Sequence, residues 1–224
     1  MKKYIILLTL SSLFLTSCLE HKQFLRINRN GSAEIEINYS IPDKYETVLA
    51  SMEGAIKQLE GQEKVSRRID PTPRFFDQRQ VFTYFQKFEG VTVHTHSSYV
   101  QDGQRQTLLK LQIANLRKAL EADIFPGWKL KQDKEKKSYT LEIRNGYNKL
   151  KNKKLDDETK KLLKGLKLNF TIRTPRLISE SNSPNKTGNT AKWNYDDSNF
   201  QKAPEAFSLT FSSKGLSFFP EEKE

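Results

Sequence analysis

The stretch Phe24–Ile41, FLRINRNGSAEIEINYSI, decides the fold class of this chain. Asn30-Gly31 lies at its centre, and both residue types tolerate the positive φ angles that tight hairpin turns require. Beyond that turn, apolar and polar side chains alternate, with Ile35, Ile37, Tyr39 and Ile41 on one face and Glu34, Glu36 and Asn38 on the other. Since successive side chains of a strand point to opposite faces, the stretch predicts a β-hairpin with one buried and one solvated face.

Two further hairpins follow the same logic. Residues 91–100 and 107–113 alternate in polarity on either side of Gln101-Asp102-Gly103, and residues 128–132 and 138–144 flank a turn rich in Lys and Glu. In the third hairpin, Trp128 and Leu130 are expected opposite Tyr139, Leu141 and Ile143. Strands are also expected at residues 168–174, 191–195 and 206–211.

Between these strands lie segments whose apolar residues recur at helical spacing. Asp43 can cap a helix over residues 45–59, Asp77 a helix ending before Gly90, and Asp156 or Asp157 a basic helix through Leu166, while residues 115–123 suit a short helix or a wide loop. Val81, Phe82, Phe85 and Phe88 form a stripe that suits either a lipid groove or, as we favour, core packing. We therefore expect an α+β fold, an antiparallel β-sheet built from hairpins with two to three helices packed on it.

The first eighteen residues predict export and lipidation. Lys2 and Lys3 precede the apolar run Tyr4–Leu15, and Leu15-Thr16-Ser17-Cys18 matches the cleavage site before a lipidated bacterial cysteine. The run is too short to cross a bilayer, which takes about 20 residues. Cys18 would then carry fatty acyl chains, such as palmitate, at the mature N-terminus. The alternatives are an ordinary secretory signal or a free cysteine in a soluble protein.

This interpretation divides the chain into a signal peptide at 1–17, a lipidated tether at 18–23, a single domain at 24–219 and a frayed tail at 220–224. The basic loop at 146–154 is the expected division if the domain has two lobes. Because Cys18 is the only cysteine, its lipidation would leave no thiol for a disulfide, a metal or a nucleophile.

Charge suggests an anionic partner. The chain carries 38 basic and 27 acidic residues, and removal of Lys2 and Lys3 with the signal leaves a net charge of +9. Such a balance favours lipid headgroups, lipopolysaccharide or anionic glycans, or else a solvated face without a ligand. Export and the presence of only Tyr147 among these cations argue against nucleic acid. The candidate contact residues are Lys149, Lys151, Lys153, Lys154, Lys160, Lys161 and Lys164.

Catalytic and metal signatures give little support to an enzyme. His94 and His96 are two apart in an expected strand, so both should lie on the face opposite Val93, but a metal site needs at least a third ligand. His21 is the remaining histidine. The sequence contains no Gly-x-Ser-x-Gly elbow and no convincing penicillin-binding signature. We expect no metal, no cofactor and no enzymatic activity, with an exported hydrolase as the less favoured alternative.

Short motifs carry a family resemblance. Ile27–Ile35 (INRNGSAEI), Arg173–Asn182 (RTPRLISESN) and Gly188–Trp193 (GNTAKW) are together similar to bacterial envelope lipoproteins of the mycobacterial lipoprotein M type. The resemblance implies a β-rich, membrane-tethered domain without established enzymatic activity, and it supplies no catalytic residue. Residues 67–154 have no counterpart in it.

The expected function is therefore that of a non-enzymatic, lipid-anchored envelope protein that binds a protein, lipid or anionic polymer through a basic face. The alternative is an accessory subunit of an outer-membrane or cell-wall assembly, which exposed strand edges would suit. In a cell with two membranes, the absence of aspartate after Cys18 favours the outer one. No small-molecule substrate is indicated.

Overall fold

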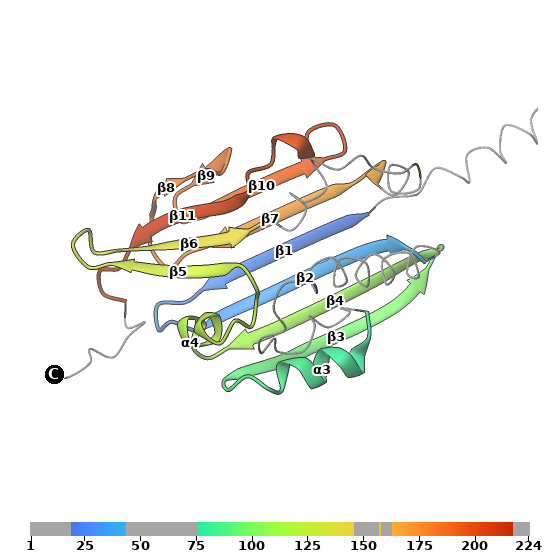
Figure 1. The fold of residues 1–224 in the computed structure, drawn as a ribbon, viewed down its shortest axis with the longest axis horizontal. Coiled ribbons are helices and arrows are strands. Elements are labelled where there is room, and N and C mark those ends of the chain that lie inside the picture. Colours follow the sequence, from blue (N-terminus) through green and yellow to red (C-terminus); the bar gives the residue numbers. More distant parts are fainter. Residues whose placement is uncertain (1–18, 44–75, 146–156, 158–162, 217–224) are drawn as a thin grey trace, which may run out of the picture.

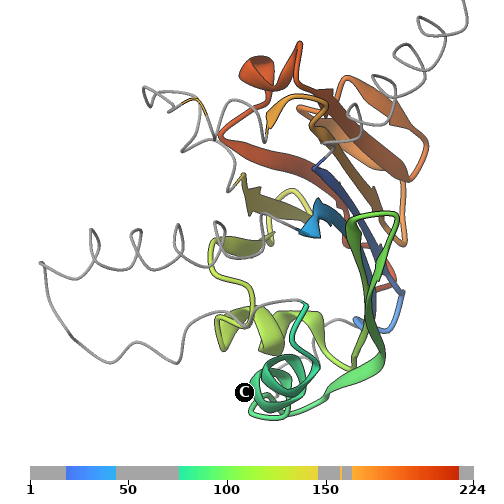
Figure 2. The same ribbon diagram turned by 90° about the vertical axis from the view of Figure 1, so that its right-hand side faces the viewer.

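The computed structural model describes residues 19–43, 76–145, 157 and 163–216, which form two facing β-sheets (Figures 1 and 2). The seven-stranded sheet has the order β3-β4-β2-β1-β7-β10-β9, and the four-stranded sheet has the order β5-β6-β11-β8. The strands are β1 (Glu20–Ile27), β2 (Ala33–Pro42), β3 (Val91–Gln101), β4 (Gln104–Ile113), β5 (Trp128–Asp133), β6 (Ser138–Arg144), β7 (Lys167–Arg173), β8 (Ile178–Ser181), β9 (Asn185–Thr187), β10 (Thr190–Asp196) and β11 (Ala206–Ser212).

The predicted α+β class is wrong, because the fold is mainly β. Within the described residues, the α-helices are α3 (Gln78–Phe85) and α4 (Leu116–Glu121), and a 3-10 turn spans Phe200–Lys202. Within the described part of the chain, the second layer over the large sheet is built chiefly by the second sheet, since β6 and β11 alternate apolar and polar residues and direct their apolar side chains inward. The helix expected at 45–59, the division at 146–154 and the tail at 220–224 lie outside the described residues.

The three predicted hairpins are confirmed. Leu25 pairs with Ile35 in β1–β2, and Trp128 and Leu130 pair with Ile143 and Leu141 in β5–β6. In β3–β4, the two turn residues Asp102 and Gly103 have φ angles of 51° and 70°. Positive φ at both central positions defines the type I′ turn, whose twist matches that of the flanking strands.

The expectation of an antiparallel sheet is wrong at its centre. Strand β1 pairs in parallel with β7, from Glu20 opposite Lys167 to Arg26 opposite Arg173. Since β1 already begins at Glu20, residues 20–23, which the sequence assigns to a tether, are part of the sheet.

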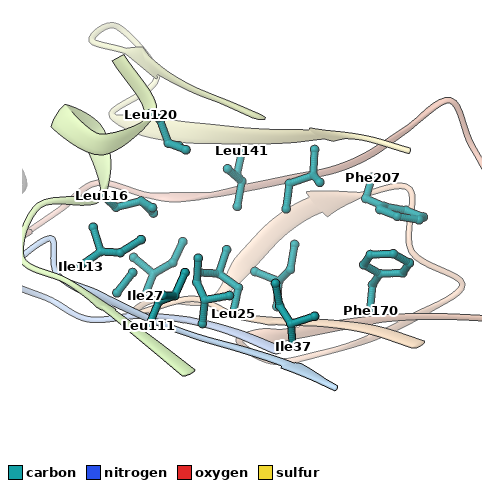
Figure 3. Packing of buried hydrophobic residues seen from close by; sticks show 14 of the residues in the cluster. Leu25, Ile27, Ile37, Leu111, Ile113, Leu116, Leu120, Leu141, Phe170 and Phe207 are labelled. Carbon is teal, nitrogen blue, oxygen red and sulfur yellow. The ribbon is translucent and has the colours of Figure 1, made fainter. Parts of the chain in front are cut away.

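The core lies between the two sheets, where Leu141 and Phe207 face Leu25, Ile37 and Phe170 across the interface (Figure 3). The Phe170 and Phe207 ring centroids are 4.5 Å apart. Trp193 is fully buried, its ring centroid lies 5.2 Å from that of Phe207, and its indole N–H donates to Asn182 Oδ1 at 3.1 Å. The indole therefore fills the core and still satisfies its polar atom.

Both described helices bury their apolar faces. In α3 the side chain of Asp77 accepts a hydrogen bond from the Gln80 amide, and Val81 and Phe85 are buried, as is Phe88 after the end of the helix. Core packing of the aromatic stripe is thus confirmed for these residues, whereas Phe82 is only partly buried. In α4, which forms where a short helix or a wide loop was predicted, Asn115 caps the helix, and Leu116 and Leu120 are buried. The two helices lie on the same side of the large sheet as β5 and β6 (Figure 2).

Candidate functional site

The residue that follows the predicted lipidation site is fixed in the fold. Leu19 is buried, and its carbonyl accepts a hydrogen bond of 2.8 Å from the Lys167 amide. Cys18 lies outside the described residues. Leu19 fixes the start of the described chain at the end of the sheet at which β1 begins.

One register row marks this end of the sheet. Tyr99, Gln106, Ser40 and Glu20 are paired in succession across β3, β4, β2 and β1, and Lys167 and Asp196 continue the row on β7 and β10. We call this row and the residues beyond it the Glu20 end; its β1–β4 part lies at the right in Figure 1. The opposite Arg26 end contains Arg26, Arg173 and the loop that follows β7.

The Glu20 end exposes two adjacent apolar side chains. Tyr99 is 52% exposed and Val100 is 47% exposed, and Gln101 separates them from the Asp102-Gly103 turn. The turn is fastened to the sheet, because the Asp43 amide donates to the Gly103 carbonyl at 2.9 Å and Arg105 Nη2 lies 3.1 Å from Asp43 Oδ1. Tyr99 and Val100 thus form an exposed tip beside a turn that Asp43 holds against the sheet.

A shallow polar hollow of about 270 Å³ lies on the same end of the sheet. Lys22 Nζ is 2.9 Å from Glu20 Oε1 at its rim, so the cation there is already paired. Hydroxyl and amide groups supply the rest of the polar lining. The lining residues are Glu20, Lys22, Asn38, Tyr39, Ser40 and Gln106.

At this end of the sheet, His21 is the titratable residue whose pKa burial shifts most clearly. Its ring centroid lies 5.2 Å from that of Phe170 and 6.0 Å from that of Tyr39. Burial lowers the pKa of His21 from 6.5 to about 4, against the smaller opposing effect of a hydrogen bond with Gln23. His21 is therefore neutral at physiological pH.

The predicted relation between His94 and His96 is wrong. The pairing of β3 with β4 shifts between Val93 and Thr95, so His94 is the extra residue of a β-bulge. The shift reverses the alternation, and His96 falls in the row of Leu109 and Ile37 on the inner face. Across the described ranges, no group of three or more His, Cys, Asp or Glu side chains is arranged to hold a metal.

The candidate basic face lies almost entirely outside the described residues. This applies to Lys149, Lys151, Lys153, Lys154, Lys160 and Lys161. Lys164 is described and exposed, in the turn that precedes β7. Among the residues with described positions, no helix is long and apolar enough to span a bilayer.

Sequence reasoning did not single out Tyr99 and Val100. A signal was available, because two consecutive large apolar residues in a strand must point to opposite faces, and at a hairpin tip both can remain exposed. The sequence showed the strand but could not show that Tyr99 and Val100 both remain exposed near its end.

No protein-family model matches the chain, and no curated protein matches it. Among solved structures, it is similar to the folded domain of the LppM protein of Mycobacterium tuberculosis, determined by NMR. The two are 13% identical, with a TM-score of 0.44 over 87% of this chain and 89% of that one.

Proposed function

We propose that this protein is a lipid-anchored bacterial lipoprotein of the cell envelope, with a non-enzymatic β-domain that binds an envelope partner. The observation that supports it is the sequence of residues 1–18, which places Cys18 after Leu-Thr-Ser at the end of a short apolar run. The residue after it, Leu19, is packed into the fold, so the domain would sit against the bilayer that holds the anchor.

The anchor would be permanent if Cys18 carries several chains. Burial of a methylene contributes about 0.8 kcal/mol, so that one myristoyl chain binds reversibly and two or three hold the protein indefinitely. Outer-membrane sorting in a cell with two membranes remains part of the proposal, on the absence of aspartate at position 19.

For the partner, the net charge of +9 after signal removal supports an anionic lipid or polymer, bound through the segment from Lys149 to Lys164. Such binding should weaken steeply as salt is raised, because the contacts are between solvated charges. An accessory role in an envelope assembly is the second candidate, supported by β3, which forms one edge of the large sheet.

Replacement of Cys18 by Ser tests the anchor. We expect the variant to leave the membrane fraction or to keep its signal peptide, and globomycin to block processing of the wild-type chain. Mass spectrometry of the purified wild type should show an acylated Cys18 at the N-terminus. An intact Met1 or a free thiol on membrane-bound protein would contradict the proposal.

A further inference from the structure

We propose that the Tyr99-Val100 tip is a second membrane contact, which inserts into the bilayer interface beside the lipid on Cys18. The inference rests on the proposed lipid anchor and adds to it a defined orientation of the domain.

Register geometry brings the tip and the anchor to the same level. Tyr99 shares its row with Glu20, which is two residues after Cys18. Three strand spacings separate β3 from β1, a lateral distance of about 14 Å. A bilayer that holds the acyl chains of Cys18 therefore lies within reach of the tip, without any rearrangement of the sheet.

The side chains suit the interfacial zone. Tyrosine has an apolar ring and a polar hydroxyl, and aromatic residues of this kind concentrate where membranes meet water. Val100 is apolar throughout, and both side chains are about half exposed to solvent. The type I′ turn and its attachment to Asp43 hold the tip in place, so that insertion costs little ordering entropy.

Beside the tip and β1, the described charges favour apolar over electrostatic contact. Lys22 is paired with Glu20, Arg105 is paired with Asp43, and Lys167 lies between Glu20 and Asp196 in the register. Cations already neutralised by carboxylates attract anionic headgroups weakly. The tip should therefore bind zwitterionic lipid, with little dependence on salt.

The Arg26 end offers a matched control. Leu177 is 72% exposed in the loop after β7, near Gly188 and a full strand length from the Glu20 row. If exposure alone drove membrane contact, Leu177 would insert as readily as Val100.

The experiment compares Val100→Cys with Leu177→Cys in the full-length lipidated protein. Acylation would block Cys18, the only native cysteine, so each variant has one thiol for the environment-sensitive fluorophore NBD. In phosphatidylcholine vesicles we expect a blue shift of the emission at position 100 and loss of fluorescence when doxyl-labelled lipid is added. Both signals should persist at high salt, and neither should occur at position 177.

In one outcome, the protein floats on the vesicles with Cys18 acylated and yet gives the same NBD emission and the same quenching at positions 100 and 177. That result would overturn the second membrane contact and leave the proposed anchor intact. A response at position 100 that disappears at high salt would overturn apolar insertion as well. Protein that fails to float and retains a reactive Cys18 would instead remove the anchor, and the inference with it.

Discussion

At the scale of single residues, the protonation of His21 makes the stability of the fold depend on pH. It lies on β1 between Tyr39 and Phe170, and burial favours its neutral form in the folded chain. The unfolded chain binds a proton at its ordinary pKa of 6.5, whereas the folded chain does so only at about 4. The stabilising contribution is therefore complete above about pH 6.5 and is lost as pH falls towards about 4.

Urea denaturation should show this dependence. Between about pH 7.5 and about pH 5 we expect the free energy of unfolding to fall by about 2 kcal/mol from this group. His21→Gln should remove most of that fall, and His94→Gln, at an exposed strand position, should retain it. An unchanged pH profile in His21→Gln would show that other groups dominate acid destabilisation.

Residue-scale prediction from sequence succeeded where burial follows from residue type and spacing, as for Phe85 and Phe88. It failed for His96, because a bulge one residue earlier reversed which face the side chain occupies. An extra residue in one strand is visible only against its partner strand, so single-strand alternation could not reveal it.

At the scale of elements, glycines with positive φ set the turns and differ in what surrounds them. At Gly103 a Cβ would meet no atom within 4 Å, whereas at Gly127 it would lie 2.9 Å from Arg144 Cβ. The φ angles are 70° and 86°, so both positions disfavour side chains on conformational grounds.

Replacement of each of these glycines by alanine should distinguish the cost of backbone strain from the cost of steric crowding. We expect Gly103→Ala to cost about 1 kcal/mol, from left-handed backbone alone. Gly127→Ala should cost about 3 kcal/mol, because the backbone of β6 must also shift. Thermal denaturation of the two variants measures the difference. Equal losses of stability in the two variants would mean that Arg144 moves away from the added Cβ at little cost.

The hairpins were predictable because each depends on one local turn and its flanking alternation, as in Asn28–Ser32 and Gln101–Gln104. The pairing of β1 with β7 was not, since each residue of β1 pairs with one 147 positions later, from Glu20 with Lys167 to Arg26 with Arg173, and neither strand's own sequence indicates its partner. The α+β expectation failed for a related reason. Alternation shows that β6 and β11 have an apolar face, but not that this face packs on a second sheet.

At the scale of the whole molecule, the two sheets share one core. Phe207 on β11 has its ring centroid 4.5 Å from that of Phe170 on β7 and 5.2 Å from that of Trp193 on β10. Its contacts therefore belong to both sheets, and neither sheet should retain stability when the other opens.

Phe207→Ala should lower the free energy of unfolding by about 3 to 5 kcal/mol, through lost burial and a residual cavity. Native-state hydrogen exchange should report the same loss in β7 and β10 as in β6 and β11. Leu177→Ala, at an exposed position, should change stability by less than about 0.5 kcal/mol. Loss of protection confined to β6 and β11 would show that the sheets open independently.

The central position of β1 also determines when the large sheet can be completed during synthesis. Among the described strands, β1 comes first in the sequence but occupies the middle of the large sheet, and its neighbour β7 begins only at Lys167. Until then, β1 has β2 beside it and an open row of amides and carbonyls on its other side, the kind of edge that invites mispairing. The large sheet can therefore be completed beside β1 only after β7 and β10 have been made.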